Sequence, residues 1–384
     1  MTFRRVLVVA QKEAREIVRD RIYFALAFLL PVVLMLVFGY GMTQEVQDVP
    51  IAIVDHDRSP QSRDYAYRFI ESRYFDFKGY VDSAEAAEPL LLDGDVRAVI
   101  VLPENFQERL ASGLPADIQT LIDGTFTFRL RTVDGYIEAI NQAFNQDVQI
   151  KHLVANVGLS SERAEILLQP LRVETRYLYN QELREIWSVA PSLVMFVLTL
   201  TSPLLMALSV VREKETGTIY NIYASTISRA EYLAGKLLPN AAVSFINGSV
   251  LVLMAVWYFG APLKGSVLFF LGAMIVFVVW ATSLGLLISV LVRTQMAATM
   301  VTVVLVMVFV MQFSGMMIPV STMTGANYVI AHFVGSMYFN EIVTQTFLKG
   351  GGFVASWREF AALVVFMLSF LAFGYLLFHK RSAA

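Results

Sequence analysis

The pattern of apolar residues along the chain is dominated by six long stretches that contain no Asp, Glu, His, Lys or Arg. Each stretch has between 19 and 27 residues, enough to cross a hydrocarbon core of ~30 Å as an α-helix. We therefore predict six membrane-spanning helices. Their predicted bounds, the last including one flanking residue at each end, are 22–42, 186–211, 237–259, 266–292, 295–318 and 359–379.

The polar insert between the first two spans, 43–185, is long enough to be a domain. Short runs rich in β-branched residues alternate there with helical segments, a pattern typical of an α/β domain. We expect strands at 50–54, 75–81, 97–102, 117–122 and 171–179, and helices at 61–72, 83–92, 103–111 and 126–168, the last broken at Gly158. The predicted fold is an α-helical polytopic membrane protein with six transmembrane helices and an inserted α/β extracytoplasmic domain.

The first 21 residues form an amphipathic helical pattern. Phe3, Leu7, Ala10, Ala14 and Ile17 follow one stripe, while most charged residues lie elsewhere. This pattern favours a helix lying in the membrane interface. The alternative is an ordinary basic flank that only anchors the first span.

Two further segments complete the predicted organisation. The segment 319–358 contains a helix-prone, apolar piece, 328–348, which is too broken to be a seventh span. We expect this outer segment to dip into the membrane or to lie on its surface. Residues 380–384 form a short tail.

Charge divides unequally between the two sides of the predicted membrane. The net charge of the chain is only −2, but 43–185 holds 14 basic and 24 acidic residues. The segments 1–21, 212–236 and 379–384, together with Arg293, hold 13 basic and 6 acidic residues. Because short basic loops stay on the cytoplasmic side, both termini are predicted to be cytoplasmic in a bacterial inner membrane.

The loop between the second and third spans, 212–236, is the most distinctive stretch. A charged helix end leads to Gly217, a short helix at 219–224, a Ser-rich turn and a charged start of the next helix. We expect Ile219, Ile222 and Tyr223 to be exposed on the short helix, which would favour a partner that covers them. The alternative is a loop that lies on the membrane.

This loop resembles the coupling region of the ABC-2 family of transporter permeases, through Glu213-x-Glu215-x-Gly217-Thr218 and Glu231…Gly235-Lys236. The rest of the chain agrees in order, including Ser314-Gly315…Pro319 after the fifth span and Leu348-Lys349-Gly350 before the sixth. The opening of the insert, 50–55, resembles that of bacterial drug-efflux permeases. Thr226 and Gly335 depart from the family pattern, since members often carry proline at these two positions.

The resemblance implies a permease that pairs with a second copy or a sister permease and exports a hydrophobic or amphipathic solute. It also implies docking of cytoplasmic ABC ATPase subunits. The implied ATPase-coupling residues are Arg212, Glu213, Glu215, Gly217, Thr218, Ile222, Tyr223, Glu231 and Lys236. A periplasmic adaptor on the inserted domain stays open, and no nucleic-acid partner is expected.

The chain also lacks the residues that would let it drive transport by itself, which are a nucleotide-binding motif or a proton relay inside the spans. Its one Gly-Lys pair, Gly235-Lys236, is followed by Leu rather than Ser or Thr, so it is no P-loop. The spans contain no titratable acid, base or histidine that could relay protons. We expect this chain to bind no cofactor and to catalyse no reaction, while ATP and magnesium are bound by a partner ATPase.

The sequence gives little support for a metal site or for cysteine chemistry. The chain has no cysteine and four scattered histidines. The acidic triplets at 55–57 and 93–95 occur where turns commonly carry acids, so we expect no metal site.

Polar residues inside the spans are candidates for a translocation path, because they are costly against lipid. These residues are Thr199, Ser202, Thr302, Gln312 and Ser314. The alternative for the hydroxyl residues is helix-to-helix hydrogen bonding, at ~0.6 kcal/mol each. Gln312 favours the path, because its amide has several hydrogen-bonding sites to satisfy.

Two other classes of protein fit parts of the pattern. A membrane-anchored receptor could use the inserted domain to bind an extracellular ligand, but it would not need an apolar docking helix in the loop. A membrane-embedded hydrolase or transferase would need acids, bases or nucleophiles that the spans do not contain. The sequence leaves the transported solute open.

Overall fold

The computed structural model describes residues 3–42, 48–125, 127–168, 176, 178–182 and 184–378. The chain divides into two compact units, one of residues 1–44 with 176–384 and one of residues 45–175. We describe each unit by itself.

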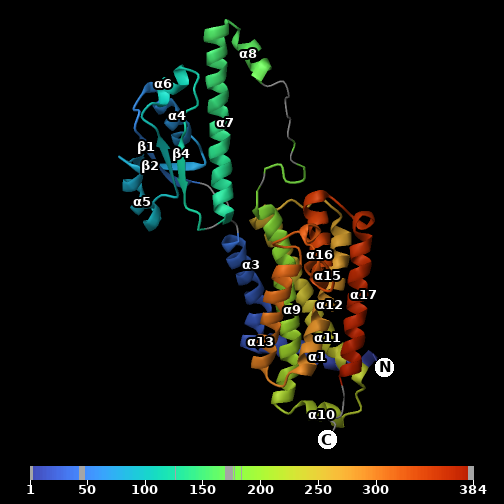
Figure 1. The fold of residues 1–384 in the computed structure, drawn as a ribbon. Helices are drawn as coiled ribbons and strands as arrows, with labels where there is room; N and C mark the ends of the chain where they lie inside the picture. The colour runs from blue at the N-terminus through green and yellow to red at the C-terminus, as the bar shows by residue number, and fades with distance from the viewer. Residues whose placement is uncertain are drawn as a thin grey trace. The chain divides into compact units, whose positions relative to one another are not determined.

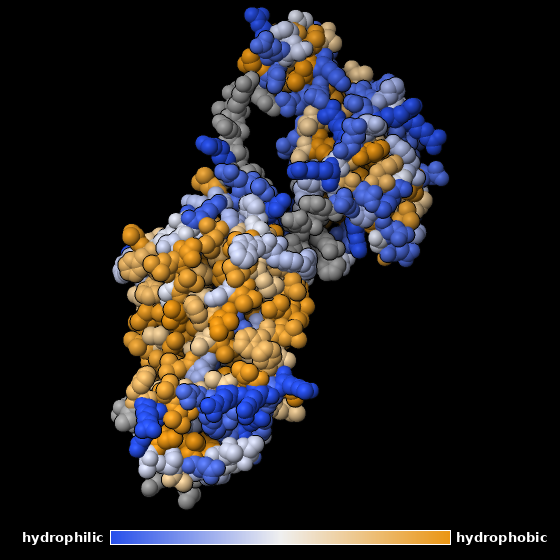
Figure 2. All heavy atoms as spheres, turned by 180° about the vertical axis from the view of Figure 1, so that it is seen from behind, coloured by the Kyte–Doolittle hydropathy of each residue, from blue (hydrophilic) through white to orange (hydrophobic). Residues whose placement is uncertain are grey.

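The first unit is a bundle of apolar helices (Figure 1). The described residues contain six helices that are long and apolar enough to cross a membrane, as predicted. Their bounds are Arg21–Gly41 (α2, a π-helical turn and α3), Ile186–Glu215 (α9), Arg229–Tyr258 (α11 and a π-helical turn), Val267–Leu291 (α12), Gln295–Phe313 (α13, a π-helical turn and α14) and Phe353–Leu377 (α17). Figure 2 shows their apolar side chains as a continuous hydrophobic belt.

Several helices run past the apolar stretches that predicted them. α9 continues beyond the apolar run to Glu215, and α11 begins at Arg229, before the run starts. The fifth helix, in contrast, ends at Phe313, before the end of its predicted stretch at 318. Gly315 follows with φ +81°. Helix length is set by backbone hydrogen bonds and caps rather than by hydrophobicity alone, so charged residues extend α9 and α11 at one end of the bundle.

α9 lies at the centre of the bundle. Every residue from Ala190 to Val211 is buried, and α12 packs along it. The two backbones approach closely where Gly285 of α12 faces Pro203 of α9. A Cβ atom added to Gly285 would lie 2.2 Å from the carbonyl oxygen of Pro203, so only glycine fits this crossing.

We expect Gly285→Ala to lower the free energy of unfolding by ~1–3 kcal/mol, because the added methyl group would force two backbones apart. Thermal unfolding of the purified protein in detergent measures this loss. Gly272→Ala is the matched control on the same helix, since no atom lies within 4 Å of its added Cβ. Equal unfolding temperatures for the two variants would contradict the close crossing.

A π-helical turn, Ala25–Leu29, interrupts the first span. Such a turn changes the regular backbone hydrogen bonding of the helix. The side-chain amide of Asn247, on α11, donates to the carbonyl oxygen of Ala27 at 2.5 Å. This polar residue therefore serves a packing role between the first and third spans.

The outer segment folds into α15 (Ala326–His332), α16 (Gly335–Thr344) and a π-helical turn, Gln345–Lys349. Its helices are all shorter than a span, as predicted. α16 is largely buried and packs against α9, α12 and α17. Phe339 of α16 stacks on Phe277 of α12 with ring centroids 4.0 Å apart, so α16 dips into the bundle rather than lying on its surface.

The second unit contains a four-stranded sheet of order β2-β1-β3-β4. β1 (Val49–Asp55) pairs in parallel with β2 (Phe75–Tyr80) and β3 (Ala98–Leu102), while β4 (Gln119–Ile122) is antiparallel to β3. The helices are α4 (Pro60–Ile70), α5 (Ala84–Asp93), α6 (Phe106–Ala111), α7 (Thr127–Val157) and α8 (Ser161–Leu168). The order of strands and helices follows the sequence pattern; the predicted strand at 171–179 lies largely outside the described residues.

Alternate residues of β1 face two apolar clusters, as expected for strands buried on both faces. Ile51 and Ile53 pack with residues of α4, α6 and α7, whereas Ala52 and Val54 pack with residues of α5. The turn after β1 is held by Asp55, whose carboxylate accepts hydrogen bonds from Arg58 N at 2.9 Å and Ser62 Oγ at 2.8 Å. The acids of this turn are therefore engaged in turn structure.

Candidate functional site

The last turn of α9, Arg212–Glu215, lies at the end of the bundle where α1 (Phe3–Arg19) and α10 (Ile219–Ala224) are found (Figure 1). We call these four residues the hub. Successive residues of a helix point about 100° apart, so each hub side chain faces a different direction. Each of them contacts a different part of the bundle.

Arg212 connects α9 to the first span. Its guanidinium lies 2.5 Å from a carboxylate oxygen of Asp20. Asp20 also caps α2, because its side chain accepts from the backbone N–H groups of Ile22 and Tyr23 at 3.0 and 3.2 Å. The N–H of Tyr23 and the Arg212 guanidinium lower the pKa of Asp20, so the carboxylate stays charged.

Glu213 connects α9 to α1 and α11. Its side chain is buried, and it lies 2.7 Å from Lys12 Nζ and 3.1 Å from Lys236 Nζ. The hydroxyl of Tyr232 donates to the same carboxylate at 2.6 Å. Although partial burial opposes it, the carboxylates of Glu213 and Glu16 raise the pKa of Lys12, so both partners are charged.

Lys236, only 1% exposed, is the centre of a buried ion-pair network. Its ammonium group lies 2.5 Å from Glu13 Oε2 and donates to Ser209 Oγ at 3.0 Å. The amide of Asn240 donates to the other oxygen of Glu13 at 3.2 Å, and Ser209 Oγ donates there too. A buried ion pair is tolerated when its remaining hydrogen-bonding sites are satisfied. In this network, Ser209 and Asn240 satisfy those of Glu13 and Lys236.

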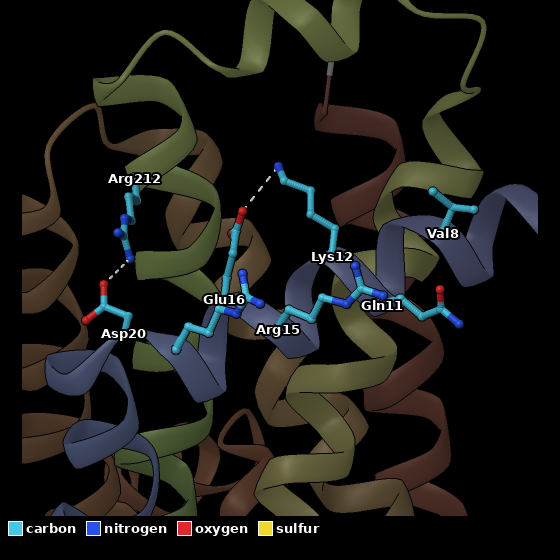
Figure 3. Close-up of a pocket in the computed structure, with 8 residues that line it drawn as sticks. Val8, Gln11, Lys12, Arg15, Glu16, Asp20 and Arg212 are labelled. Carbon is cyan, nitrogen blue, oxygen red and sulfur yellow. Dashed lines mark hydrogen bonds and ion pairs between the residues drawn. The ribbon is translucent and has the colours of Figure 1, made fainter.

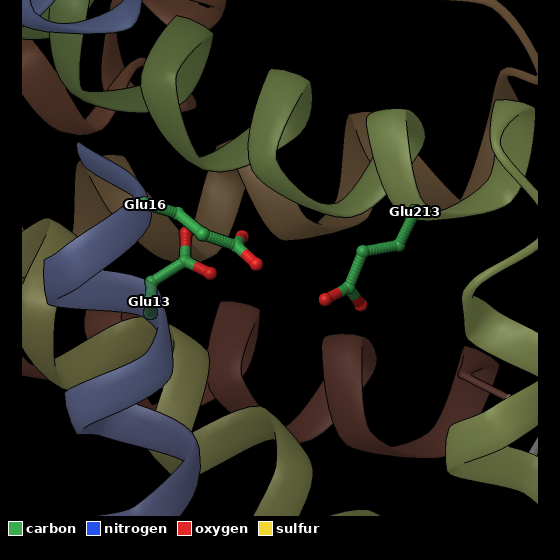
Figure 4. A group of neighbouring side chains, drawn as sticks. All are labelled: Glu13, Glu16 and Glu213. Atoms are coloured by element: carbon green, nitrogen blue, oxygen red, sulfur yellow. The ribbon is translucent and has the colours of Figure 1, made fainter. Parts of the chain in front are cut away.

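Three carboxylates, from Glu13, Glu16 and Glu213, come together in this network (Figure 4), with ligand oxygens within 4.8 Å of one another. Such a group can attract a cation. Here the ammonium groups of Lys12 and Lys236 already supply positive charge, at 2.7 Å from Glu213 and 2.5 Å from Glu13. The cluster is therefore an ion-pair network between helices.

Lys214 and Glu215 connect the hub to the fourth and fifth spans. Lys214 donates to the carbonyl oxygens of Ser289 and Val292, at the end of α12. Glu215 accepts from the backbone N–H of Gln295 at 2.7 Å and from its side-chain amide, at the start of α13. Both contacts satisfy backbone groups that helix ends leave unpaired, and they tie two more spans to α9.

The chain leaves the hub through Gly217, which has φ +74°, a conformation that favours glycine. α10 follows, and Ser228 with Glu231 then forms a capping box at the start of α11. The expectation that Ile219 is exposed is wrong. Ile219 is buried in the cluster around Val210 and Tyr232, and Ile222 and Tyr223 are partly covered by it, because α10 folds back onto α9 and α11.

The outer surface of α10 is instead formed by Tyr220, Asn221 and Ala224. Tyr220 is 63% exposed, and its ring packs edge-on against Tyr223. An exposed aromatic ring held by a second ring is a typical anchor for a protein partner. The outer surface of α10 therefore carries a residue type that is enriched at protein interfaces.

The predicted coupling residues thus fall into three sets. Arg212, Glu213, Glu215 and Lys236 hold helices together at or beside the hub. Gly217, Thr218 and Glu231 shape the turns on either side of α10, and the Thr218 hydroxyl donates to the Glu213 carbonyl at 3.4 Å. Ile222 and Tyr223 are partly buried between α10 and the rest of the bundle.

The candidate path residues differ in their surroundings. The hydroxyls of Thr199 and Thr302 donate to carbonyl oxygens within their own helices, at 2.7 and 2.8 Å. Ser202 and Ser314 are buried, and Gln312 is exposed. Their role in transport stays a prediction.

Sequence reasoning did not identify most partners of the hub. The missed partners of the hub and of the Lys236 network are Lys12, Glu13, Asp20, Ser209, Tyr232, Asn240 and Gln295. Lys214 of the hub itself and Tyr220 of α10 were also missed. One signal was available: the buried face of α1 is Val6, Val9, Glu13 and Ile17. An acid at helical spacing within an apolar face indicates a buried partner.

Six apolar helices of spanning length, with the polar hub at one end of the bundle, define a multi-span membrane protein. A comparison with protein families agrees, since residues 21–376 match the model of the ABC-2 family transporter proteins. The chain belongs to this family, and the resemblance found in its sequence is confirmed.

Its relatives include permeases of Escherichia coli. The chain is 26% identical to the probable multidrug ABC transporter permease YbhS, over 91% of this chain and 90% of that protein. It is 24% identical to the probable multidrug ABC transporter permease YbhR, over 99% of both. The inner membrane transport permease YhhJ is 26% identical over 86% of this chain and 85% of its own length.

Proposed function

We propose that this chain is the membrane-spanning permease subunit of an ABC exporter. A separate cytoplasmic ATPase drives it by docking on the outer face of α10. The permease acts as a dimer, with a second copy or a sister permease, and moves a hydrophobic or amphipathic solute outward across a bacterial inner membrane. Two of its relatives are named as probable multidrug permeases, which supports this solute class.

The hub is the observation that carries this proposal. α10 is connected through three residues to Glu215, and the hub side chains contact the first, third, fourth and fifth spans as well as α1. A displacement of α10 is therefore transmitted to most of the bundle through these charged contacts. A bundle whose long apolar runs hold no titratable group needs such an external source of work.

The orientation follows from charge. The end with α1 and the hub carries the basic segments, and the second unit carries an excess of acids. The positive-inside rule then places both termini and the hub in the cytoplasm and the α/β domain outside. ATP and magnesium bind to the ATPase, which this chain contacts without binding nucleotide.

Docking on α10 predicts that Tyr220→Ala combined with Asn221→Ala weakens binding of the partner ABC ATPase subunit by about 30-fold or more, the loss typical of an interface hot spot. Copurification and titration of the ATPase onto the permease in detergent measure it. Tyr67→Ala is the control, because Tyr67 is an equally exposed tyrosine of α4 in the other unit. Unchanged ATPase binding by the double variant would contradict docking on α10.

A further inference from the structure

α1 presents three different faces. Val6, Val9, Glu13 and Ile17 are buried against the bundle. The neighbouring face carries Phe3, Leu7, Ala14 and Val18, which are exposed although apolar; Phe3 is 81% exposed and Val18 66%. The third face is basic. In water the apolar face would be unfavourable, so it indicates contact with the bilayer.

A groove runs along the basic face, between α1 and the end of α9. Its volume is about 590 Å³, within the range of small-molecule sites. Val8 and Gln11 line it, with four basic and two acidic side chains: Lys12, Arg15, Arg19, Arg212, Glu16 and Asp20. The groove therefore has an excess of two positive charges.

Both acids of the groove already have basic partners. Glu16 lies 3.5 Å from Lys12, and Asp20 lies 2.5 Å from Arg212. Figure 3 shows these two pairs, with Arg15 lying along α1 and making no marked contact. Within the described part of the chain, the side chains of Arg15 and Arg19 have no hydrogen-bond or ion-pair partner, and both are exposed.

Arg15 and Arg19 are four residues apart, so their guanidinium groups lie on the same side of α1. On the helical wheel this side borders the apolar face with Val18. Two unpaired guanidinium groups next to an apolar surface suit a phospholipid, because guanidinium binds phosphate oxygens in a two-pronged geometry and the apolar surface can contact acyl chains. An acidic protein surface would leave the exposed apolar face unexplained.

We propose that this groove binds the phosphate headgroup of an anionic phospholipid from the leaflet that contacts α1. Arg15 and Arg19 bind the phosphate, Gln11 donates to it, and Phe3, Leu7 and Val18 contact the acyl chains. The site makes the position of α1 dependent on lipid composition. Since α1 holds Glu13 and Lys12 against the hub, the bound lipid stabilises the hub. This site does not require the ATPase.

The test uses the full-length permease in detergent micelles, with phosphatidylglycerol, phosphatidylcholine or inorganic phosphate added. Native mass spectrometry counts bound lipid, and thermal unfolding measures the stabilisation. We expect phosphatidylglycerol to bind and to raise the unfolding temperature, whereas phosphatidylcholine and inorganic phosphate do neither. Arg15→Gln with Arg19→Gln should weaken phosphatidylglycerol binding about tenfold or more.

The control is Lys151→Gln with Arg163→Gln, which removes two exposed basic side chains from the other unit. This control should bind phosphatidylglycerol like the wild type. Equal lipid binding by the Arg15/Arg19 variant would overturn the proposal. If that variant kept its lipid binding but lost copurification with the ATPase, the groove would be a protein-docking surface instead. Stabilisation of the wild type by inorganic phosphate alone would equally overturn the lipid as ligand.

Discussion

Lys236→Met is expected to destabilise the permease by ~3–5 kcal/mol, the loss typical when one partner of a buried ion pair is removed. The substitution keeps the length of the side chain but removes its ammonium group. Glu13 is only 2% exposed and would lose the cation that lies 2.5 Å from its carboxylate. Glu213 would keep Lys12 but lose its second cation. Thermal or denaturant unfolding in detergent measures the loss.

The double variant Glu13→Gln with Lys236→Met tests the cause. It removes one negative and one positive charge together, and Glu213 remains paired with Lys12. We expect the double variant to be more stable than Lys236→Met alone, so the two effects are not additive. If Lys236→Met unfolded like the wild type, or if the two losses simply added, the ion pair would not hold α1 against α11.

The second large effect concerns coupling between ATP hydrolysis and transport. Glu213→Ala with Glu215→Ala removes the contacts of the hub with α1, α11 and α13, but leaves the outer surface of α10 in place. We therefore expect the ATPase to bind, while its stimulation by the permease in proteoliposomes falls about fivefold or more, within the usual range of coupling between sites. ATPase activity and copurification are measured on the same samples.

Glu162→Ala with Glu165→Ala is the matched control, since it removes two exposed acids of α8. It should leave both binding and stimulation unchanged. Unchanged stimulation by the Glu213/Glu215 variant would remove the hub from the coupling route. Loss of binding together with stimulation would instead assign the two glutamates to docking.

The spans and the strands could be predicted from the sequence because both depend on local patterns. A spanning helix needs an uninterrupted apolar run, and the runs at 22–42 and 266–292 are long enough to cross a membrane. The parallel strands of the insert are buried on both faces, so β1 and β3 appear as short runs of Val and Ile. The broken pattern at 328–348 also predicted short helices, because none of its pieces is long enough to span.

The contacts of the candidate site could not be predicted in the same way. Lys12 and Glu213 are 201 residues apart in the chain, and Glu13 and Lys236 are 223 apart. Nothing near Glu213 distinguishes a glutamate that faces a partner protein from one buried between helices. For the same reason Ile219 was expected to be exposed, since a helix as short as α10 does not reveal which side folds back.

The sequence by itself determined that this chain crosses a membrane with six apolar helices, belongs with the ABC-2 permeases, and carries basic segments at one end of its bundle. These properties follow from hydrophobic runs, local motifs and summed charge, which need no knowledge of packing. Only the tertiary structure decided that four consecutive residues of α9 contact α1 and four spans, and that Arg15 and Arg19 are left without partners among the described residues. Charge pairing in a low-dielectric environment depends on distances of a few ångströms between distant parts of the chain, and only the folded bundle fixes those distances.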